Sequence, residues 1–278
     1  MNGFALNNIQ NAYVGSTPAQ AIYIGSTLIW PTTPPTPHDY SQDYLTIVSL
    51  ENNNDIAWMV TQTVYDDWSK VISVSTDNGV TWTSYQSTSN VTGTKLATLN
   101  TGDKLLIKGN NTYYGYNYGD QIMFGNHFIS SGNFTVEGNI MSLIYDDNFI
   151  GQTTLSADNA FSTLFYNCTK LISAENLILP ATVLSQRCYK DMFRGCTLLT
   201  TAPALSASIL VDECYKRMFM DCTSLNYIKC LATDISANDC IYSFTYNVSN
   251  SGTFVKDANT TWPSGVSGIP SGWTVINA

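Results

Sequence analysis

The sequence predicts a mainly β protein with α/β repeats, and three observations carry this prediction. One motif recurs between Leu155 and Phe244 with a period of about 26 residues, as in a stacked solenoid. Short segments that alternate apolar and polar residues fill residues 41–150, a pattern typical of a β-sandwich. Charged residues are only 12% of the chain, and Asn, Ser, Thr and 17 Tyr supply the polarity instead. That composition suits strands and turns better than long salt-bridged helices.

At 278 residues the chain has room for two domains, or for one domain with appendages. We expect five segments in chain order. They are a small β-hairpin anchor (1–30), a Pro-rich linker (31–40), a β-sandwich domain (41–150), a repeat solenoid (151–250) and a Trp-rich capping segment (251–278).

The N-terminal segment contains two copies of Tyr-x-Gly-Ser-Thr, which begin at Tyr13 and Tyr23, and the second copy leads to Trp30. Alternating residues around each Gly-Ser pair predict short strands joined by turns. Because so small a sheet is marginal in water, we expect it to dock on a larger assembly through Tyr13, Tyr23 and Trp30. An ordinary hairpin that caps the next domain is the alternative. Four prolines in residues 31–37 then predict a stiff, extended spacer.

In the sandwich segment we expect strands at residues 44–50, 71–75, 80–85, 104–108 and 134–138. Asp77-Asn78-Gly79 predicts a tight hairpin turn between the second and third of these.

A run rich in tyrosine, asparagine and glycine follows in the same segment. Tyrosine beside Asn and Gly is typical of adaptable binding loops, and tyrosine rings also stack on sugars. The candidate surface-binding residues are Tyr113, Tyr114, Tyr116 and Tyr118. The alternative is a long hairpin whose tyrosines pack on the neighbouring repeats.

Each repeat contains Cys-Tyr-x-x-Met-Phe-x-x-Cys-Thr-x-Leu or a close variant. We expect a short helical turn around Cys-Tyr-x-x-Met-Phe, followed by a short strand, with neighbouring units covering each other's apolar face. The expected repeat core comprises Phe165, Cys168, Cys188, Phe193, Cys196, Cys214, Phe219 and Cys222. The cysteines lack the paired spacing of zinc sites, and their number, seven, is odd. We therefore expect them to serve as small buried side chains rather than as metal ligands or a disulfide ladder. Trp262 and Trp273 should cover the last unit.

Little in the sequence indicates catalysis, and we predict no enzyme activity, no cofactor and no metal. Of the two histidines, His127 has no nucleophile motif beside it. The adjacent pairs Asp66-Asp67 and Asp146-Asp147 should point to opposite sides of an extended chain. A net charge of −9 argues against nucleic-acid binding. The chain shows neither an export signal nor an apolar run of membrane-spanning length, so we expect synthesis in a cytoplasm and no membrane insertion.

The repeat, with Leu-Pro-Ala-Thr-x-Leu ahead of its Cys-Tyr motif, resembles the BspA-like leucine-rich repeats of gut Bacteroidales and their phages, of the crAss-like type. The likeness covers about 155–278, including Trp-Pro-x-Gly…Gly-Ile-Pro-x-Gly-Trp-Thr-Val. The phrases at 75–82 and 134–143 look like the Ig-like β domain usually placed before such repeats. The paired Tyr-x-Gly-Ser-Thr elements are similar to N-terminal attachment modules of phage virion proteins.

This resemblance implies contact with proteins or glycans rather than catalysis. It favours a virion structural protein, a head- or tail-fibre-like appendage on the virion surface, made in the host bacterial cytoplasm. Its partners would be a capsid or tail protein at the N-terminus and a host surface glycan or protein at the body. Because a short anchor gains strength from several copies, we expect a homo-oligomer such as a trimer. The alternatives are a bacterial surface adhesin with leucine-rich repeats and a glycan-degrading tail protein.

Overall fold

The computed structural model describes residues 13–14, 17–18, 22–24, 27–30, 37–61, 68–89, 92–118 and 122–278. The chain divides into two compact units, Met1–Asp39 and Tyr40–Ala278. The described helices are short, namely η1 (Tyr40–Gln42), α1 (Ser142–Tyr145) and η2 (Asp146–Asn148), and the remaining described elements are strands. The prediction of a mainly β protein is confirmed.

The N-terminal unit contains two small antiparallel pairs of strands. The strands are β1 (Tyr13–Val14) with β2 (Thr17–Pro18), and β3 (Ile22–Ile24) with β4 (Thr27–Trp30). Each pair flanks one of the two Gly-Ser dipeptides, where the sequence predicts a reversal of the chain. Tyr13, Tyr23 and Trp30 lie in these strands; the expectation that their side chains dock on a partner falls outside the described residues.

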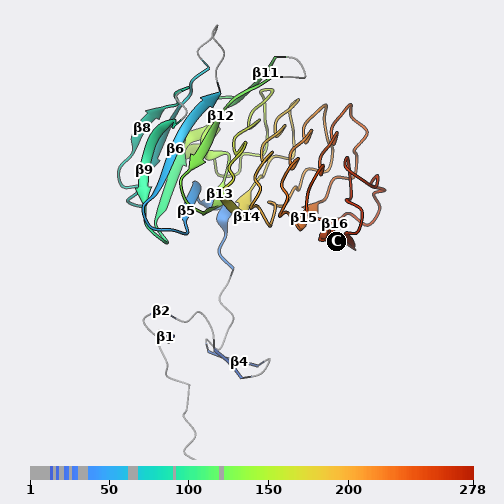
Figure 1. Cartoon of the computed structure of the whole chain (residues 1–278), viewed down its shortest axis with the longest axis horizontal. Helices are drawn as coiled ribbons and strands as arrows, with labels where there is room; N and C mark the ends of the chain where they lie inside the picture. The colour runs from blue at the N-terminus through green and yellow to red at the C-terminus, as the bar shows by residue number, and fades with distance from the viewer. Residues whose placement is uncertain are drawn as a thin grey trace, which may run out of the picture. The chain divides into compact units, whose positions relative to one another are not determined.

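The second unit begins with two sheets that face each other. The first has the order β14-β13-β5-β10-β7-β8 and the second the order β11-β12-β6-β9 (Figure 1). The bounds are β5 (Leu45–Ser49), β6 (Asn54–Thr61), β7 (Val71–Ser75), β8 (Thr83–Gln86), β9 (Thr94–Leu99), β10 (Lys104–Lys108), β11 (Gly115–Tyr118), β12 (Ile122–Ser130), β13 (Phe134–Asn139) and β14 (Leu171–Ile178).

All five strands predicted in this segment have a counterpart, and β7 and β10 have the predicted bounds. The loop between β7 and β8 is longer than expected, because pairing starts only at Val74 and Thr83. The turn itself is present, since Asn78 and Gly79 both have positive φ, at 57° and 86°. Trp82, in the added loop, instead packs edge-on against Tyr44 at 5.0 Å between ring centroids.

The repeats continue the first sheet. β14 pairs in parallel with β13, and further along the chain β15 (Tyr227–Cys230), β16 (Thr253–Lys256) and β17 (Thr274–Asn277) pair in parallel with one another. Bridges from Ser173 to Thr201 and from Thr201 to Tyr227 join β14 to β15. We call this run of parallel pairing from β13 to β17 the strand layer.

The opposite side of the repeats is built from overlapping turns, and the predicted helical turn is wrong. Between residues 185 and 197 alternate N–H groups bond to the next repeat: Tyr189 N donates to Cys214 O at 3.1 Å and Phe193 N to Met218 O at 3.0 Å. A helix would use those donors internally. Arg187 and Asp191 also have positive φ, which an α-helix excludes. Stacking against the neighbouring repeat therefore overrides the local helical pattern; we call this side the turn layer.

The turn layer continues the second sheet, so sandwich and repeats share one core. Phe128 N in β12 donates to Leu164 O at 3.1 Å, and Tyr114 N donates to Ala160 O at 2.9 Å. Gly115 and Gly125 face each other across β11 and β12, and a Cβ on Gly125 would lie 1.8 Å from Thr163 Oγ1. Glycine is needed at this joint because the first repeat rests directly on the backbone.

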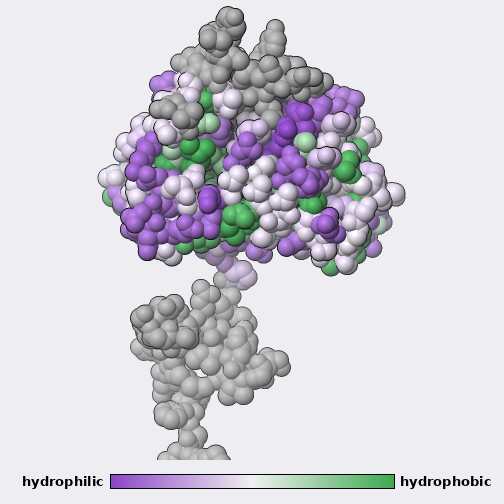
Figure 2. Space-filling model, viewed as in Figure 1, coloured by the Kyte–Doolittle hydropathy of each residue, from purple (hydrophilic) through white to green (hydrophobic). Residues whose placement is uncertain are grey.

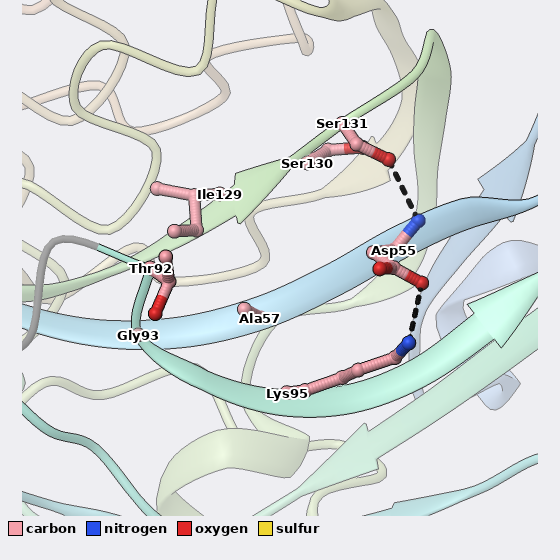
Figure 3. Close-up of a pocket in the computed structure, with 8 residues that line it drawn as sticks. All are labelled: Asp55, Ala57, Thr92, Gly93, Lys95, Ile129, Ser130 and Ser131. Carbon is pink, nitrogen blue, oxygen red and sulfur yellow. Dashed lines mark hydrogen bonds and ion pairs between the residues drawn. The ribbon is translucent and has the colours of Figure 1, made fainter.

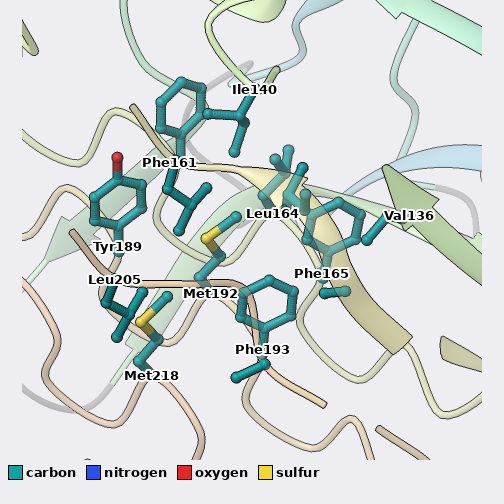
Figure 4. Close-up of a cluster of buried hydrophobic side chains, with 14 of the residues drawn as sticks. Val136, Ile140, Phe161, Leu164, Phe165, Tyr189, Met192, Phe193, Leu205 and Met218 are labelled. Atoms are coloured by element: carbon teal, nitrogen blue, oxygen red, sulfur yellow. The ribbon is translucent and has the colours of Figure 1, made fainter. Parts of the chain in front are cut away.

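Two columns of aromatic rings run through the shared core; Figure 4 labels Phe165 and Phe193 of one and Phe161 and Tyr189 of the other. One passes from Trp58 through Phe128, Phe165, Phe193 and Phe219 to Phe244, with neighbouring ring centroids 4.7–5.7 Å apart. The other passes from Tyr114 through Phe161, Tyr189 and Tyr215 and meets the first at Phe244. Offset or tilted rings at these distances attract one another in addition to their burial.

The eight residues predicted as repeat core are all buried. The thiols of Cys168, Cys196 and Cys222 donate to backbone carbonyls of the unit before them. The acceptors are Phe128 O in β12 for Cys168, Phe165 O for Cys196 and Phe193 O for Cys222. All seven cysteines are free, and burial raises the pKa of the Cys196 thiol well above its usual range, so it stays protonated. At the far end Trp262 packs on Phe244 and Phe254, and Trp273 is also buried.

Ion pairs tie neighbouring repeats together on the turn layer. Glu213 accepts hydrogen bonds from Arg187 Nη2 at 2.7 Å and from Lys190 Nζ at 2.8 Å, and Asp191 accepts from Arg217 Nε at 2.9 Å. Lys190 and Asp191 are each 1% exposed. Charges this deeply buried need their partners to offset desolvation.

Gly195 tests the close packing of this layer. It has φ +77°, and an added Cβ would lie 2.1 Å from Asn167 Oδ1, whereas Gly151, also at φ +77°, has no atom within 4 Å of an added Cβ. We expect Gly151→Ala to lower the free energy of unfolding by about 1–2 kcal/mol, through backbone strain alone. Gly195→Ala should lower it further. Urea denaturation of both variants measures the difference; equal losses would show that the Asn167 side chain moves aside without cost and would contradict the prediction for Gly195.

Candidate functional site

The four tyrosines predicted to form a binding surface differ in their surroundings. Tyr114 is buried, stacks on Phe161 at 6.4 Å between ring centroids, and donates its hydroxyl hydrogen bond to Leu143 O. Its prediction as a surface-binding residue was therefore wrong. The alternative, a tyrosine packed on the neighbouring repeats, describes it, because Phe161 belongs to the first repeat.

Tyr113 is half-buried, and the Lys70 ammonium lies 4.0 Å from its ring centroid. One face of this ring is thus occupied by a cation–π contact. Tyr116 and Tyr118 belong to β11, which pairs with β12. Their side chains lie outside the described residues, so their predicted role in binding stays a prediction.

The structure describes only one of the two pairs of adjacent aspartates. Asp66 and Asp67 lie outside the described residues. Asp146 and Asp147 do not point apart as expected for an extended chain: Lys108 Nζ lies 2.8 Å from Asp146 Oδ1 and 2.7 Å from Asp147 Oδ1. The chain turns here, with φ +50° at Asp146, and this turn brings both carboxylates to one ammonium group.

His127 is buried in β12, and Tyr166 of the first repeat lies edge-on to its ring at 6.1 Å between centroids. Burial lowers the pKa of His127 to about 4, so the ring is neutral at pH 7. Its position suits packing between sandwich and repeats. Within the described ranges no three His, Cys, Asp or Glu side chains are grouped to hold a metal ion, and no helix there has the length and apolar character to cross a bilayer.

A groove of about 430 Å³ lies on the outer face of the second sheet, across β12, β6 and β9 (Figure 3). Ala57 in β6 is paired with Ile129 on one side and with Lys95 on the other, so these three residues lie side by side on neighbouring strands. Ala57 and Ile129 give the groove an apolar floor. Polar residues line the rest of the groove, namely Asp55, Thr92, Lys95, Ser130 and Ser131, and the Ser130 hydroxyl donates to Asn54 and Gly132.

A β-bulge shapes one end of this groove. Register shifts between Ile56 and Ala57, so that both Lys95 and Thr98 of β9 reach the carboxylate of Asp55. Lys95 Nζ lies 2.7 Å from Asp55 Oδ1, and Thr98 Oγ1 donates to the same oxygen at 2.6 Å. Bulges commonly re-aim side chains at binding sites. Here the bulge concentrates polar groups beside the apolar floor.

The other end is formed by the turn that leads into β9. Gly93 has φ +65°, and an added Cβ would lie 3.0 Å from Trp58 O and 3.2 Å from Met59 Cβ. The backbone of this turn is therefore pressed against β6, which only glycine allows at that φ. Thr92 lines the groove beside it.

The charges of the groove are matched. Hydrogen bonds from Lys95 and Thr98 lower the pKa of Asp55, which keeps the carboxylate ionised beside the ammonium group at neutral pH. Both side chains are about half exposed, 58% for Lys95 and 47% for Asp55, so they are within reach of a solute. The site can therefore offer both a hydrogen-bond acceptor and donors, without a strong net charge.

A second groove, of about 520 Å³, is lined mostly by polar groups, including Asp103 and Lys104. Its charged groups are paired, as they are in the first groove: Asp103 accepts from Asn100 N at 2.8 Å and Lys104 pairs with Glu137 at 2.6 Å. It differs in its lining, because it lacks the apolar floor that the first groove has. We therefore take the first groove as the candidate binding site.

No sequence motif pointed to this groove. Its residues come from three strands and a turn that are far apart in the chain, and none belongs to a motif. The apolar run Ile56-Ala57-Trp58-Met59-Val60 could have indicated a strand, in which Asp55 and Ala57 lie on one face. The pairing with β9 and β12, and the bulge, come only from the fold.

Comparison of the chain with family models, with curated proteins and with solved structures found no match.

Proposed function

We propose that this protein is a phage virion appendage, fibre-like on the head or the tail, which is anchored by residues 1–30 and displays a binding surface for a host glycan or protein. The observation that carries the proposal is the division of the chain into a short β-hairpin unit and a large body with one continuous core. A small sheet of this kind needs a partner surface to be stable. The proline-rich stretch between the two fits a spacer.

Within this proposal the body is a BspA-like leucine-rich-repeat solenoid. Its Ig-like sandwich covers the first repeat, and the segment with Trp262 and Trp273 covers the last. The stacked aromatic columns and the parallel strand layer support a solenoid, because each rung buries its apolar face only against its neighbours. The sandwich supplies the covering unit through β12 and β13, which pair directly with the first repeat.

The body's outer surface fits contact rather than catalysis. Figure 2 shows hydrophilic residues over much of one face, with small and separate hydrophobic areas. Tyrosines such as Tyr242 and Tyr246, 52% and 44% exposed, add rings that can contact a partner. Several copies on one particle would turn weak contacts into firm adhesion, which supports a homo-oligomer such as a trimer.

The rival proposals are a bacterial surface adhesin and a glycan-degrading tail protein. The second would need an acid, which either the Asp66 and Asp67 pair or the Asp146 and Asp147 pair could contribute; the carboxylates of the latter pair are both held by Lys108. We expect the full chain to leave host polysaccharide uncleaved, and Asp147→Asn to leave binding to that polysaccharide unchanged. Reducing-end release by the native chain that is lost in Asp147→Asn would establish a hydrolase instead.

Host contact is tested with the fluorescently labelled full chain. It should bind the host bacterium of the phage, and an excess of unlabelled chain should reduce adsorption of that phage. A chain that binds no host cells and leaves adsorption unchanged would contradict the proposed display function.

A further inference from the structure

We propose that the groove across β12, β6 and β9 binds one neutral sugar ring. This inference rests on the proposed function for the source of the sugar, a host surface glycan. It assigns the contact to this groove rather than to the tyrosine-rich segment. Three features of the groove support this assignment: its size, its apolar floor and the hydrogen-bonding capacity of its charged end (Figure 3).

The groove has the dimensions and lining of a small-ligand site. At about 430 Å³ it falls within the range of about 300–1,000 Å³ that is usual for such sites. Its floor is formed by Ala57 and Ile129, two aliphatic side chains on adjacent strands. A pyranose ring has one face made largely of C–H groups, which can pack on such a floor, whereas its hydroxyls need polar partners at the edge.

The charged end supplies those partners. Lys95 Nζ has three N–H donors, and its bond to Asp55 uses one of them. Asp55 Oδ1 already accepts from Lys95 and Thr98, while Oδ2 accepts no hydrogen bond from the described residues. A hydroxyl that donates to Oδ2 and a neighbouring hydroxyl that accepts from Nζ would satisfy both groups. Two adjacent hydroxyls on one ring have this arrangement.

The charge balance selects a neutral ligand. Because Asp55 and Lys95 neutralise each other at 2.7 Å, the groove offers an anionic or cationic sugar no net electrostatic attraction. A neutral sugar binds both without disturbing them. Hydrogen bonds to charged groups are also stronger than those between neutral groups, which favours hydroxyls at this end.

The test is saturation-transfer NMR on the full chain with a panel of neutral probes, the methyl glycosides of glucose, galactose, mannose and N-acetylglucosamine. We expect at least one glycoside to bind with a Kd on the order of 1–10 mM, as for a single small ring. Ala57→Leu fills the floor, and Lys95→Met removes the donors from an exposed position. Each should weaken binding at least about tenfold, and Asp103→Asn, in the second groove, should leave it unchanged. Matching unfolding midpoints check that the variants fold.

The inference is overturned if none of the glycosides binds at about 10 mM, or if Ala57→Leu and Lys95→Met bind as the native chain does. Its failure can be told apart from failure of the proposed function. Binding to host cells without binding to any of the glycosides would support the display function and contradict the sugar site in the groove. Binding of a glycoside in the groove without binding to host cells would support the sugar site and contradict the display function.

Discussion

Replacing Phe193 by alanine is expected to lower the free energy of unfolding by about 3–5 kcal/mol, as for other fully buried phenylalanines. Phe193 is fully buried and stacks between Phe165 and Phe219, at 5.3 and 5.6 Å between ring centroids. Removing its ring interrupts the first aromatic column at its middle and leaves a cavity between two rungs. Because the rungs above and below depend on one another, relaxation around the cavity should be limited.

The measurement is urea denaturation followed by tryptophan fluorescence, with Tyr246→Ala as the matched control. Tyr246 is an aromatic residue of a later repeat but is 44% exposed, and its truncation should cost less than about 1 kcal/mol. The shared core also predicts that Phe193→Ala shifts the unfolding of sandwich and repeats together. Separate transitions, with only one of them shifted, would show that the two parts fold independently and would contradict the continuous core.

Replacing Glu213 by glutamine is expected to cost a similar amount, about 3–5 kcal/mol, because it removes one partner of a buried charge. Glu213 bonds to Lys190, which is 1% exposed, and to Arg187. The variant keeps the shape of the side chain and removes the carboxylate that binds Lys190 and Arg187. Glu137→Gln is the matched control. It breaks the pair with Lys104, whose side chain is 50% exposed, and should cost at most about 1 kcal/mol.

The Glu213 carboxylate also makes the free energy of unfolding depend on pH. Burial by itself would raise the pKa of Glu213, but the hydrogen bonds from Arg187 and Lys190 and the nearby positive charges outweigh it and lower the pKa to about 2. The unfolded value is 4.5. Since the folded pKa is the lower one, the stability from this group is complete above pH 4.5 and is lost as the pH falls toward 2. Denaturation at pH 5 and pH 3 should show a loss in the native chain that is smaller in Glu213→Gln; equal losses would contradict this assignment.

The strands and the repeat core could be predicted because their signals are local. Alternation around Val71–Ser75 and Lys104–Lys108 fixes which residues face inward, and the 26-residue period aligns Phe193 with Phe219. The helical turn was predicted wrongly since Cys, Met and Phe at those spacings also suit a helical stripe. The hydrogen bonds between repeats and the positive φ at Arg187 are what show that the segment forms turns and not a helix.

Tertiary contacts decided what the sequence left open. Tyr114 looked like its neighbours in the tyrosine-rich run, and the approach of Phe161 is what buries it. Asp146 and Asp147 converge on Lys108 because the chain bends between a helical turn and the next segment. The groove depends on a bulge that pairs Lys95 and Thr98 with Asp55, which no pattern within one strand encodes.

The central claim, that this protein is an appendage of a virion, is tested most directly by immunogold electron microscopy. An antibody raised against residues 41–278 is applied to purified phage particles and to envelopes of the host bacterium. We predict gold on the capsid or the tail, which would also locate the protein on the particle. Unlabelled particles beside labelled bacterial envelopes would contradict the claim and favour the bacterial adhesin.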